Sequence, residues 1–189
     1  MRFFAALLPP AEALDELGLA AVPLRALPGD ERLRWVARPD WHITLAFFGA
    51  VEPDQLPALR AGLAEVAGNT PPLTLRLAGA GAFGRRHLWA GVAGDLAPLG
   101  RLAAASAAAG QAAGAPGGTP HDAYRPHLTL ARHRDRNGDL DSRLALLSGF
   151  RGSPWPAGPV VLMSADDDPG AGYTTEAGWP LGGAAAGHH

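Results

Sequence analysis

Cysteine and lysine are both absent from this sequence of 189 residues, in which all 16 basic residues are arginine. The absence of cysteine excludes disulfide bonds, thiolate nucleophiles and cysteine-ligated zinc. The absence of lysine excludes lysine Schiff bases and nucleotidyl transfer through a lysine. Any anion that binds to this protein must therefore meet a guanidinium, an imidazole or a backbone amide.

A strong excess of one charge and a long hydrophobic run are missing as well. The formal net charge of −2 at pH 7 argues against a protein held on nucleic acid by bulk electrostatics. The N-terminal apolar run, residues 3–8, is shorter than the about 7–15 residues of a signal peptide core and the about 20 of a membrane span. With 47% hydrophobic residues, we expect a cytoplasmic monomer with its own core and no membrane partner.

Hydrophobic periodicity predicts an α+β fold with antiparallel sheets. Predicted strands and helices do not alternate one to one along the chain, which argues against a doubly wound parallel sheet. The predicted strands are residues 2–8, 33–36, 42–48, 73–77, 88–92, 127–131, 160–164 and 173–179. The predicted helices are residues 10–27, 53–67, 96–113 and 140–147.

Three segments have less regular patterns. The glycines of residues 79–84 resemble a dinucleotide-binding loop, but no helix pattern follows them, so we predict a hairpin turn there. Residues 132–139 are polar and are expected to be exposed. Residues 1–181 are expected to form one domain, followed by a low-complexity tail, 182–189, whose His188 and His189 are consistent with the start of an expression tag.

An internal repeat is the most informative feature of the chain. The segment His42-Ile43-Thr44-Leu45-Ala46 recurs in the second half as His127-Leu128-Thr129-Leu130-Ala131. Since residues i and i+2 of a strand share a face, the histidine and the threonine of each copy should point the same way, with the apolar residues opposite. Two imidazoles and two hydroxyls would then line one groove if the halves face each other.

This set of side chains suits phosphoryl chemistry without a metal or another cofactor. A neutral imidazole can accept a proton from the attacking oxygen while an imidazolium donates one to the leaving oxygen, and an imidazole pKa near 6.5 makes both forms available. Threonine hydroxyls and an arginine can hold the phosphate oxygens. A zinc site formed by His121, His127 and His133 is disfavoured, because Pro126 interrupts the strand that would align them.

The paired His-x-Thr motifs resemble the signature of the two-histidine phosphoesterase superfamily. The surrounding sequence narrows this resemblance to the LigT-like RNA 2′,3′-cyclic phosphodiesterases. The matching segments are residues 34–36, 41–49, 81–84, 88–92, 125–132, 160–164 and 172–173. The resemblance implies two pseudo-symmetric lobes, each an antiparallel sheet with outer helices, that enclose a central cleft.

The resemblance also implies a reaction and a role for each site residue. The reaction is hydrolysis of a 2′,3′-cyclic phosphate, at an RNA 3′ end or on a nucleoside, to a 2′-phosphomonoester. The implied roles are His42 as proton donor, His127 as proton acceptor, and Thr44, Thr129 and Arg132 as phosphate-binding residues. Phe47, which occupies in the first copy the position of Arg132 in the second, and Arg125 are further candidate substrate contacts.

Several alternatives stay open at the level of sequence. The same motifs would serve a 2′–5′ RNA ligase or another two-histidine cyclic phosphodiesterase. A non-catalytic module that binds RNA ends would not need a matched acid and base, and a metallohydrolase would be sensitive to chelators. Arg85, Arg86 and His87 could contact an RNA backbone, although a solvated hairpin tip is the simpler interpretation.

Overall fold

The computed structural model describes residues 1–117, 123–168 and 170–182. In chain order its elements are β1 (Arg2–Leu7), α1 (Ala11–Arg25), β2 (Leu33–Trp35), β3 (Ile43–Gly49), α2 (Leu56–Gly68), β4 (Thr74–Phe83), β5 (His87–Gly94), α3 (Leu96–Ala112), β6 (His127–His133), α4 (Asp141–Leu147), β7 (Trp155–Pro156), β8 (Val160–Ala165) and β9 (Tyr173–Trp179). The expectations for His121, His188 and His189 fall outside the described residues. Within the described part of the chain, no helix is long and apolar enough to cross a membrane.

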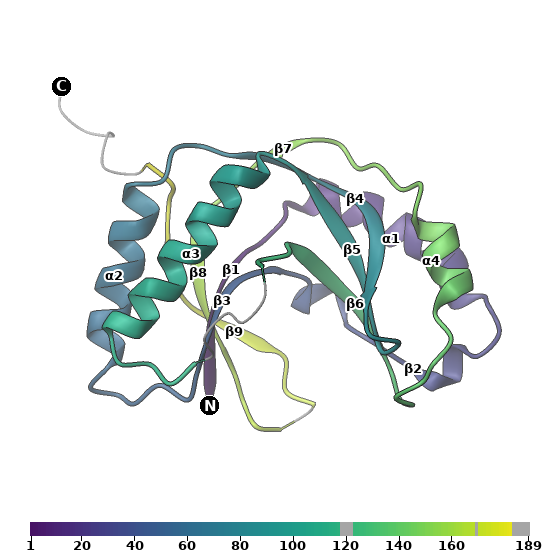
Figure 1. The fold of residues 1–189 in the computed structure, drawn as a ribbon, viewed down its shortest axis with the longest axis horizontal. Helices are drawn as coiled ribbons and strands as arrows, with labels where there is room; N and C mark the ends of the chain where they lie inside the picture. The colour runs from purple at the N-terminus through teal and green to yellow at the C-terminus, as the bar shows by residue number, and fades with distance from the viewer. Residues whose placement is uncertain (118–122, 169, 183–189) are drawn as a thin grey trace.

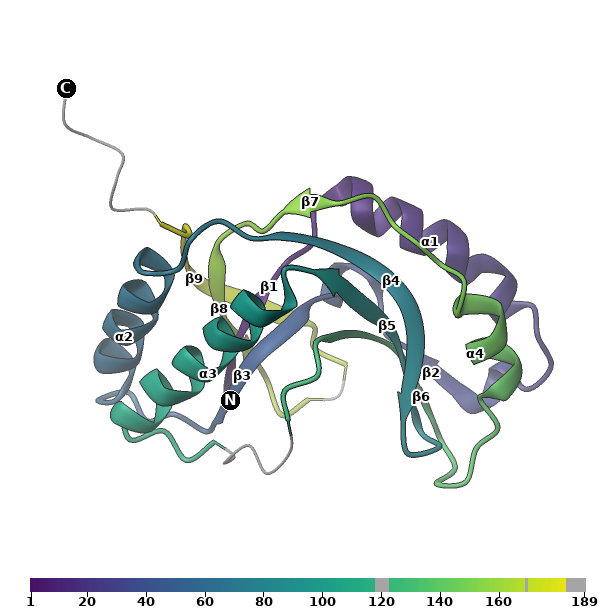
Figure 2. The same cartoon turned by 45° about the horizontal axis from the view of Figure 1, so that its top comes forward.

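The strands form two antiparallel sheets, which confirms the expected α+β class. One sheet has the strand order β3-β1-β8-β9, and the other has the order β2-β6-β5-β4-β7. Helices α2 and α3 cover one side of the molecule and α1 and α4 cover the other, with the two sheets between them (Figures 1 and 2). The two copies of the repeat therefore lie in different sheets, on β3 and β6, and these two strands contact each other.

The apolar residues of the repeat hold both motif strands in the core. Ile43 and Leu45 on β3, and Leu128 and Leu130 on β6, are all buried, as the alternating pattern predicts. Helix α3 packs closely on β3 because a glycine faces the sheet: a Cβ at Gly110 would lie only 2.5 Å from the ring of Phe48. The buried apolar residues of each motif thus hold its strand in place, with the histidine and the threonine on the other face.

The glycine-rich segment 79–84 is not the hairpin turn that its composition predicts. Strand β4 continues to Phe83, and the chain reverses only at Gly84–Arg86 before β5 begins. The glycines lie in the strand for local steric reasons. Gly79 has a positive φ of 71° next to an irregularity in the β4–β5 register, and a Cβ at Gly81 would collide with the indole ring of Trp89.

The segment 132–139 is also more structured than predicted. Strand β6 extends through Arg132 to His133, and only Arg132 of these two residues is exposed. The imidazole of His133 is buried, and its Nδ1 accepts a hydrogen bond of 3.0 Å from the backbone N–H of Asp135. The expectation of an exposed polar loop therefore holds only beyond the end of the strand.

Candidate active site

The first motif places an imidazole in a fixed orientation. The Nδ1–H of His42 donates to the backbone carbonyl of Asp40 at 2.7 Å, and Nε2 lies 3.0 Å from the hydroxyl oxygen of Thr44. Since a carbonyl oxygen can only accept, Nδ1 carries the proton in the neutral ring and Nε2 carries the lone pair. His42 and Thr44 therefore act as one unit, as their i, i+2 spacing predicts.

The second motif repeats only the bond to the backbone. The Nδ1–H of His127 donates to the backbone carbonyl of Arg125 at 2.7 Å, and its Nε2, unlike that of His42, forms no hydrogen bond with the threonine of its motif. In both motifs the carbonyl acceptor belongs to the residue two places before the histidine. Arg125 thus contributes its backbone to the site, whereas its side chain is exposed. We call the surface that contains His42, Thr44, His127 and Thr129 the histidine face.

Burial lowers the pKa of both histidines below its usual value. For His42, the Asp40 carbonyl and the charge of the Asp40 carboxylate oppose this effect, while a positive charge on His127 adds to it. For His127, the carbonyl of Arg125 is what opposes burial. The effect is one-sided, since His42 is not among the causes that shift the pKa of His127, and the placement of both rings in one groove stays a prediction.

Both motif strands contain an irregularity at the same place in the motif. In β3 the register with β1 shifts between the pairs Ala6–Thr44 and Ala5–Ala46, and in β6 the register with β5 shifts between Trp89–Thr129 and Leu88–Ala131. Each shift leaves one extra residue, Leu45 or Leu130, and reverses the alternation of the side chains beyond it. The two irregularities are equivalent, because each follows the threonine of its motif.

This reversal decides where Phe47 and Arg132 point. Each lies five residues after its histidine, an odd spacing that would put it on the opposite face of a regular strand. With the extra residue, Phe47 pairs with Phe4 and Arg132 with His87, both on the histidine face. Phe47 is half exposed and Arg132 is exposed, so both are available to a ligand.

Aromatic rings enclose each histidine, and the sequence alone did not single them out. His42 lies 4.9 Å from the ring of Phe4 and 5.1 Å from Tyr173, which meets it edge-on. His127 lies 4.7 Å from Phe83 and 5.8 Å from Trp89. These rings come from the neighbouring strands β1, β9, β4 and β5, so only the sheet pairing could identify them.

Two further polar contacts hold the site together. The phenol of Tyr124 donates to the backbone carbonyl of Thr44 at 2.7 Å, and burial raises the pKa of Tyr124. The carboxylate of Asp40 accepts a hydrogen bond of 3.0 Å from the backbone N–H of Tyr173, which fixes the segment that orients His42. The position of Tyr124, three residues before the second histidine, was the available sequence signal for the first of these contacts.

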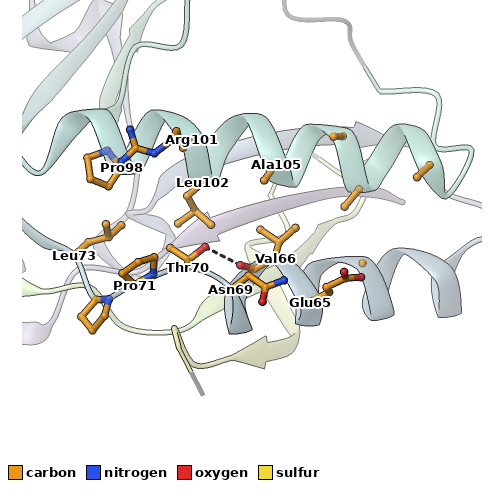
Figure 3. A pocket seen from close by; sticks show the side chains of 15 residues that line it. Glu65, Val66, Asn69, Thr70, Pro71, Leu73, Pro98, Arg101, Leu102 and Ala105 are labelled. Atoms are coloured by element: carbon orange, nitrogen blue, oxygen red, sulfur yellow. Dashed lines mark hydrogen bonds between the residues drawn. The ribbon is translucent and has the colours of Figure 1, made fainter. Parts of the chain in front are cut away.

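Two grooves lie away from the histidine face. A groove of about 570 Å³ runs between α2 and α3 and is lined mainly by apolar and small side chains, with Glu65 on α2 and Arg101 on α3 among its polar residues (Figure 3). A second groove, of about 380 Å³, lies beside Arg32, His133 and Arg143. Across the described residues, no group of three or more His, Asp or Glu side chains is placed to hold a metal ion. The enclosed central cleft therefore stays a prediction.

The fold and motif geometry agree with comparisons to known proteins. A model described as LigT like phosphoesterase matches residues 7–93, which include the first motif. The solved structure of TT0787 from Thermus thermophilus aligns with a TM-score of 0.78 and 26% identity, over 97% of this chain and 100% of that chain. The chain resembles the LigT-like phosphoesterases in its first motif and in its fold. The structure of E. coli LigT complexed with ATP is also similar, with a TM-score of 0.71 and 25% identity over 95% of this chain and 97% of that one.

A curated relative with a similar sequence supports the same family resemblance. An RNA 2′,3′-cyclic phosphodiesterase of Geobacillus stearothermophilus is 31% identical over 154 residues, which make up 79% of this chain and 48% of that protein. The chain thus spans about half the length of this curated relative. The family resemblance drawn from the two motifs is confirmed.

Proposed function

We propose that this protein hydrolyses 2′,3′-cyclic phosphates at RNA 3′ ends or on nucleosides to 2′-phosphomonoesters, with His42 and His127 as the acid–base pair. The name of the Geobacillus relative supports this reaction class. The observation that carries the proposal is the matched orientation of the two rings. Each Nδ1 is fixed on a backbone carbonyl, which leaves Nε2 of each ring as the nitrogen that can exchange a proton with substrate, although in His42 this nitrogen also meets the hydroxyl of Thr44.

Each histidine moves one proton. The lone pair on Nε2 of His127 takes a proton from the attacking water as the oxygen–phosphorus bond forms. The bond between phosphorus and the 3′ oxygen breaks, and Nε2–H of protonated His42 gives its proton to that oxygen. The products are a 2′-phosphomonoester and a free 3′ hydroxyl, with His42 neutral and His127 protonated until the two exchange protons with solvent.

The surroundings of the two rings support this division of roles. The charge of the Asp40 carboxylate favours the protonated form of His42, which is the form a proton donor needs. Among the described residues, no carboxylate is a cause of the pKa shift of His127, which suits a neutral proton acceptor. Thr44, Thr129 and Arg132 share the histidine face and offer hydroxyl and guanidinium donors to the phosphate oxygens as their negative charge increases.

The test is hydrolysis of a nucleoside 2′,3′-cyclic phosphate in the presence of a chelator, with the 2′- and 3′-phosphate products separated. We expect only the 2′ product from the wild type, and a loss of roughly 10²- to 10⁴-fold in kcat for His42→Gln and for His127→Gln. Arg60→Gln, an exposed substitution on α2, is the control and should keep full activity.

Each other outcome removes a defined part of the proposal. Formation of the 3′-phosphate would show that the 2′ oxygen leaves instead of the 3′ oxygen, and it would overturn the assigned product. Binding of the cyclic phosphate without turnover by the wild type would favour a module that only binds RNA ends. Loss of turnover with the chelator would rule out the metal-free mechanism.

A further inference from the structure

A row of cationic side chains crosses three adjacent strands beside the histidine face. Arg132 on β6 pairs with Arg34 on β2 and, on its other side, with His87 on β5. Directly paired residues of antiparallel strands have Cα atoms about 4.5–5.5 Å apart and side chains on the same face. The three residues are therefore neighbours in space although they are far apart in the sequence. We call them the cationic row.

The cationic row lies on the histidine face of its sheet. Arg132 is on that face because of the irregularity at Leu130, and its partners follow it. The neighbours of Arg34 in β2 point the other way: Leu33 is buried, and Trp35 lies under the guanidinium of Arg25 from α1. Arg85 and Arg86 are exposed at the turn, in agreement with a solvated hairpin tip, whereas His87 is the first residue of β5 and lies on the histidine face.

The charges of the cationic row are not neutralised by the protein. Neither Arg34 nor Arg132 forms an ion pair or a side-chain hydrogen bond with the described residues, whereas Arg32 nearby pairs with Asp135 at 2.7 Å. Burial lowers the pKa of His87, and the charges of Arg132, Arg86 and His127 act in the same direction, so the charge of the row is carried mainly by the two arginines. Like charges directly opposite each other destabilise a sheet, so an anion bound across the row would offset a cost that the fold otherwise bears.

The cationic row is displaced from the catalytic pair. Allowing one extra residue at the irregularity, Arg132 lies four regular strand steps from His127, or about 13 Å between Cα atoms at roughly 3.3 Å per step. A phosphate held by Arg34 and His87 is therefore a different phosphate from the one between the two histidines. Arg132 lies between these two residues, so it is the one residue of the row that belongs to both phosphate contacts.

We propose that Arg34, His87 and Arg132 form a subsite for a second phosphate, the one on the 5′ oxygen of the nucleoside whose 2′,3′-cyclic phosphate is hydrolysed. This inference rests on the proposed function. In an RNA chain that second phosphate is the last internucleotide phosphodiester. The subsite makes an RNA 3′ end a better substrate than a nucleoside cyclic phosphate, and it recognises the backbone without reading the sequence.

Three substrates test the subsite: a nucleoside 2′,3′-cyclic phosphate, the same compound with a 5′-phosphate, and a dinucleotide that ends in the same cyclic phosphate. We expect the wild type to show a kcat/KM at least tenfold higher on the two substrates with the additional phosphate. In Arg34→Gln this advantage should fall about tenfold, mainly through KM. Arg60→Gln, which removes an exposed charge from α2, is the matched control and should keep the full advantage.

Two results would overturn the subsite. One is an equal advantage in Arg34→Gln and the wild type, and the other is an advantage for the dinucleotide but none for the 5′-phosphate, which would indicate base or ribose contacts. Calorimetric titration of a nucleoside 5′-phosphate separates this inference from the proposed function. If no cyclic phosphate is hydrolysed but this ligand binds about tenfold more weakly to Arg34→Gln than to the wild type, the proposed function fails and the subsite stands. Equal binding to both proteins would remove the subsite.

Discussion

The phenol of Tyr124 donates a 2.7 Å hydrogen bond to the backbone carbonyl of Thr44 and so connects the segment leading into the second motif to the strand of the first. This contact spans the two sheets at the level of the catalytic pair. Since the carbonyl belongs to the residue whose hydroxyl meets His42, a displacement of Tyr124 is passed directly to the histidine face.

Tyr124→Phe removes this hydrogen bond and leaves a carbonyl without its partner. We expect the free energy of unfolding to fall by about 1–3 kcal/mol. We also expect kcat to fall by roughly 10- to 100-fold with a smaller change in KM, because the two motifs lose their alignment. Thr70→Val, which removes the 2.7 Å bond from Thr70 to the carbonyl of Val66 far from the site, should lower stability without this loss of kcat. Equal kcat in the two variants would contradict a positioning role for Tyr124.

Gly81→Ala should damage the wall of the site beside His127. The added Cβ collides with the ring of Trp89, so the indole, which contacts His127, must move. We expect a loss of about 1–3 kcal/mol in unfolding free energy, together with reduced kcat/KM. The control is Gly100→Ala in α3, where a Cβ meets nothing within 4 Å and should stabilise the helix by about 0.5–1 kcal/mol. Chemical denaturation of both variants measures the two effects.

The pH dependence of kcat/KM should be bell-shaped, with its maximum on the acid side of 6.5. Burial lowers the pKa of both catalytic histidines, and the rate needs one neutral and one protonated ring. Asp40→Asn removes a charge that favours protonated His42 but keeps an oxygen that can accept from Tyr173. The limb of the profile that reports His42 should therefore move to lower pH in this variant, while both limbs at their wild-type positions would show that the carboxylate does not tune the proton donor.

Stability should decrease on acidification through the same groups. Because the folded-state pKa of His42 is below its unfolded value of about 6.5, the unfolded chain binds more protons as the pH falls below 6.5. The stability contributed by a neutral, buried His42 is thus present above that pH and is lost progressively as the pH falls through the folded-state pKa. His42→Gln should show a shallower loss of unfolding free energy between pH 7 and pH 5 than the wild type, as measured by denaturant titration at each pH. A parallel pH dependence would exclude His42 as a source of the effect.

The sequence predicted the class of fold and the contact between His42 and Thr44 because both depend on short-range patterns. Alternating apolar residues identified the motif strands, and the i, i+2 rule placed Thr44 beside His42. Gly81 was mispredicted. The glycine-rich composition suggested a turn, whereas Gly81 lies within β4 and its missing side chain leaves space for the indole of Trp89 on β5. Tyr173 and Trp89 were not identified as site residues, since their contacts with the histidines depend on strand pairing over long distances in the chain.

The equivalent irregularities at Leu45 and Leu130 have a consequence for the evolution of substrate preference. They bring the residue five places after each histidine to the surface that meets substrate, without any change in the buried positions. The two halves can therefore keep a common proton-transfer frame while a single position in each half diverges. Here that position is an aromatic ring in one half, Phe47, and a cation in the other, Arg132. Equivalent positions of the two motifs thereby carry unlike side chains, which would suit the unlike base and phosphate of the proposed nucleotide substrate.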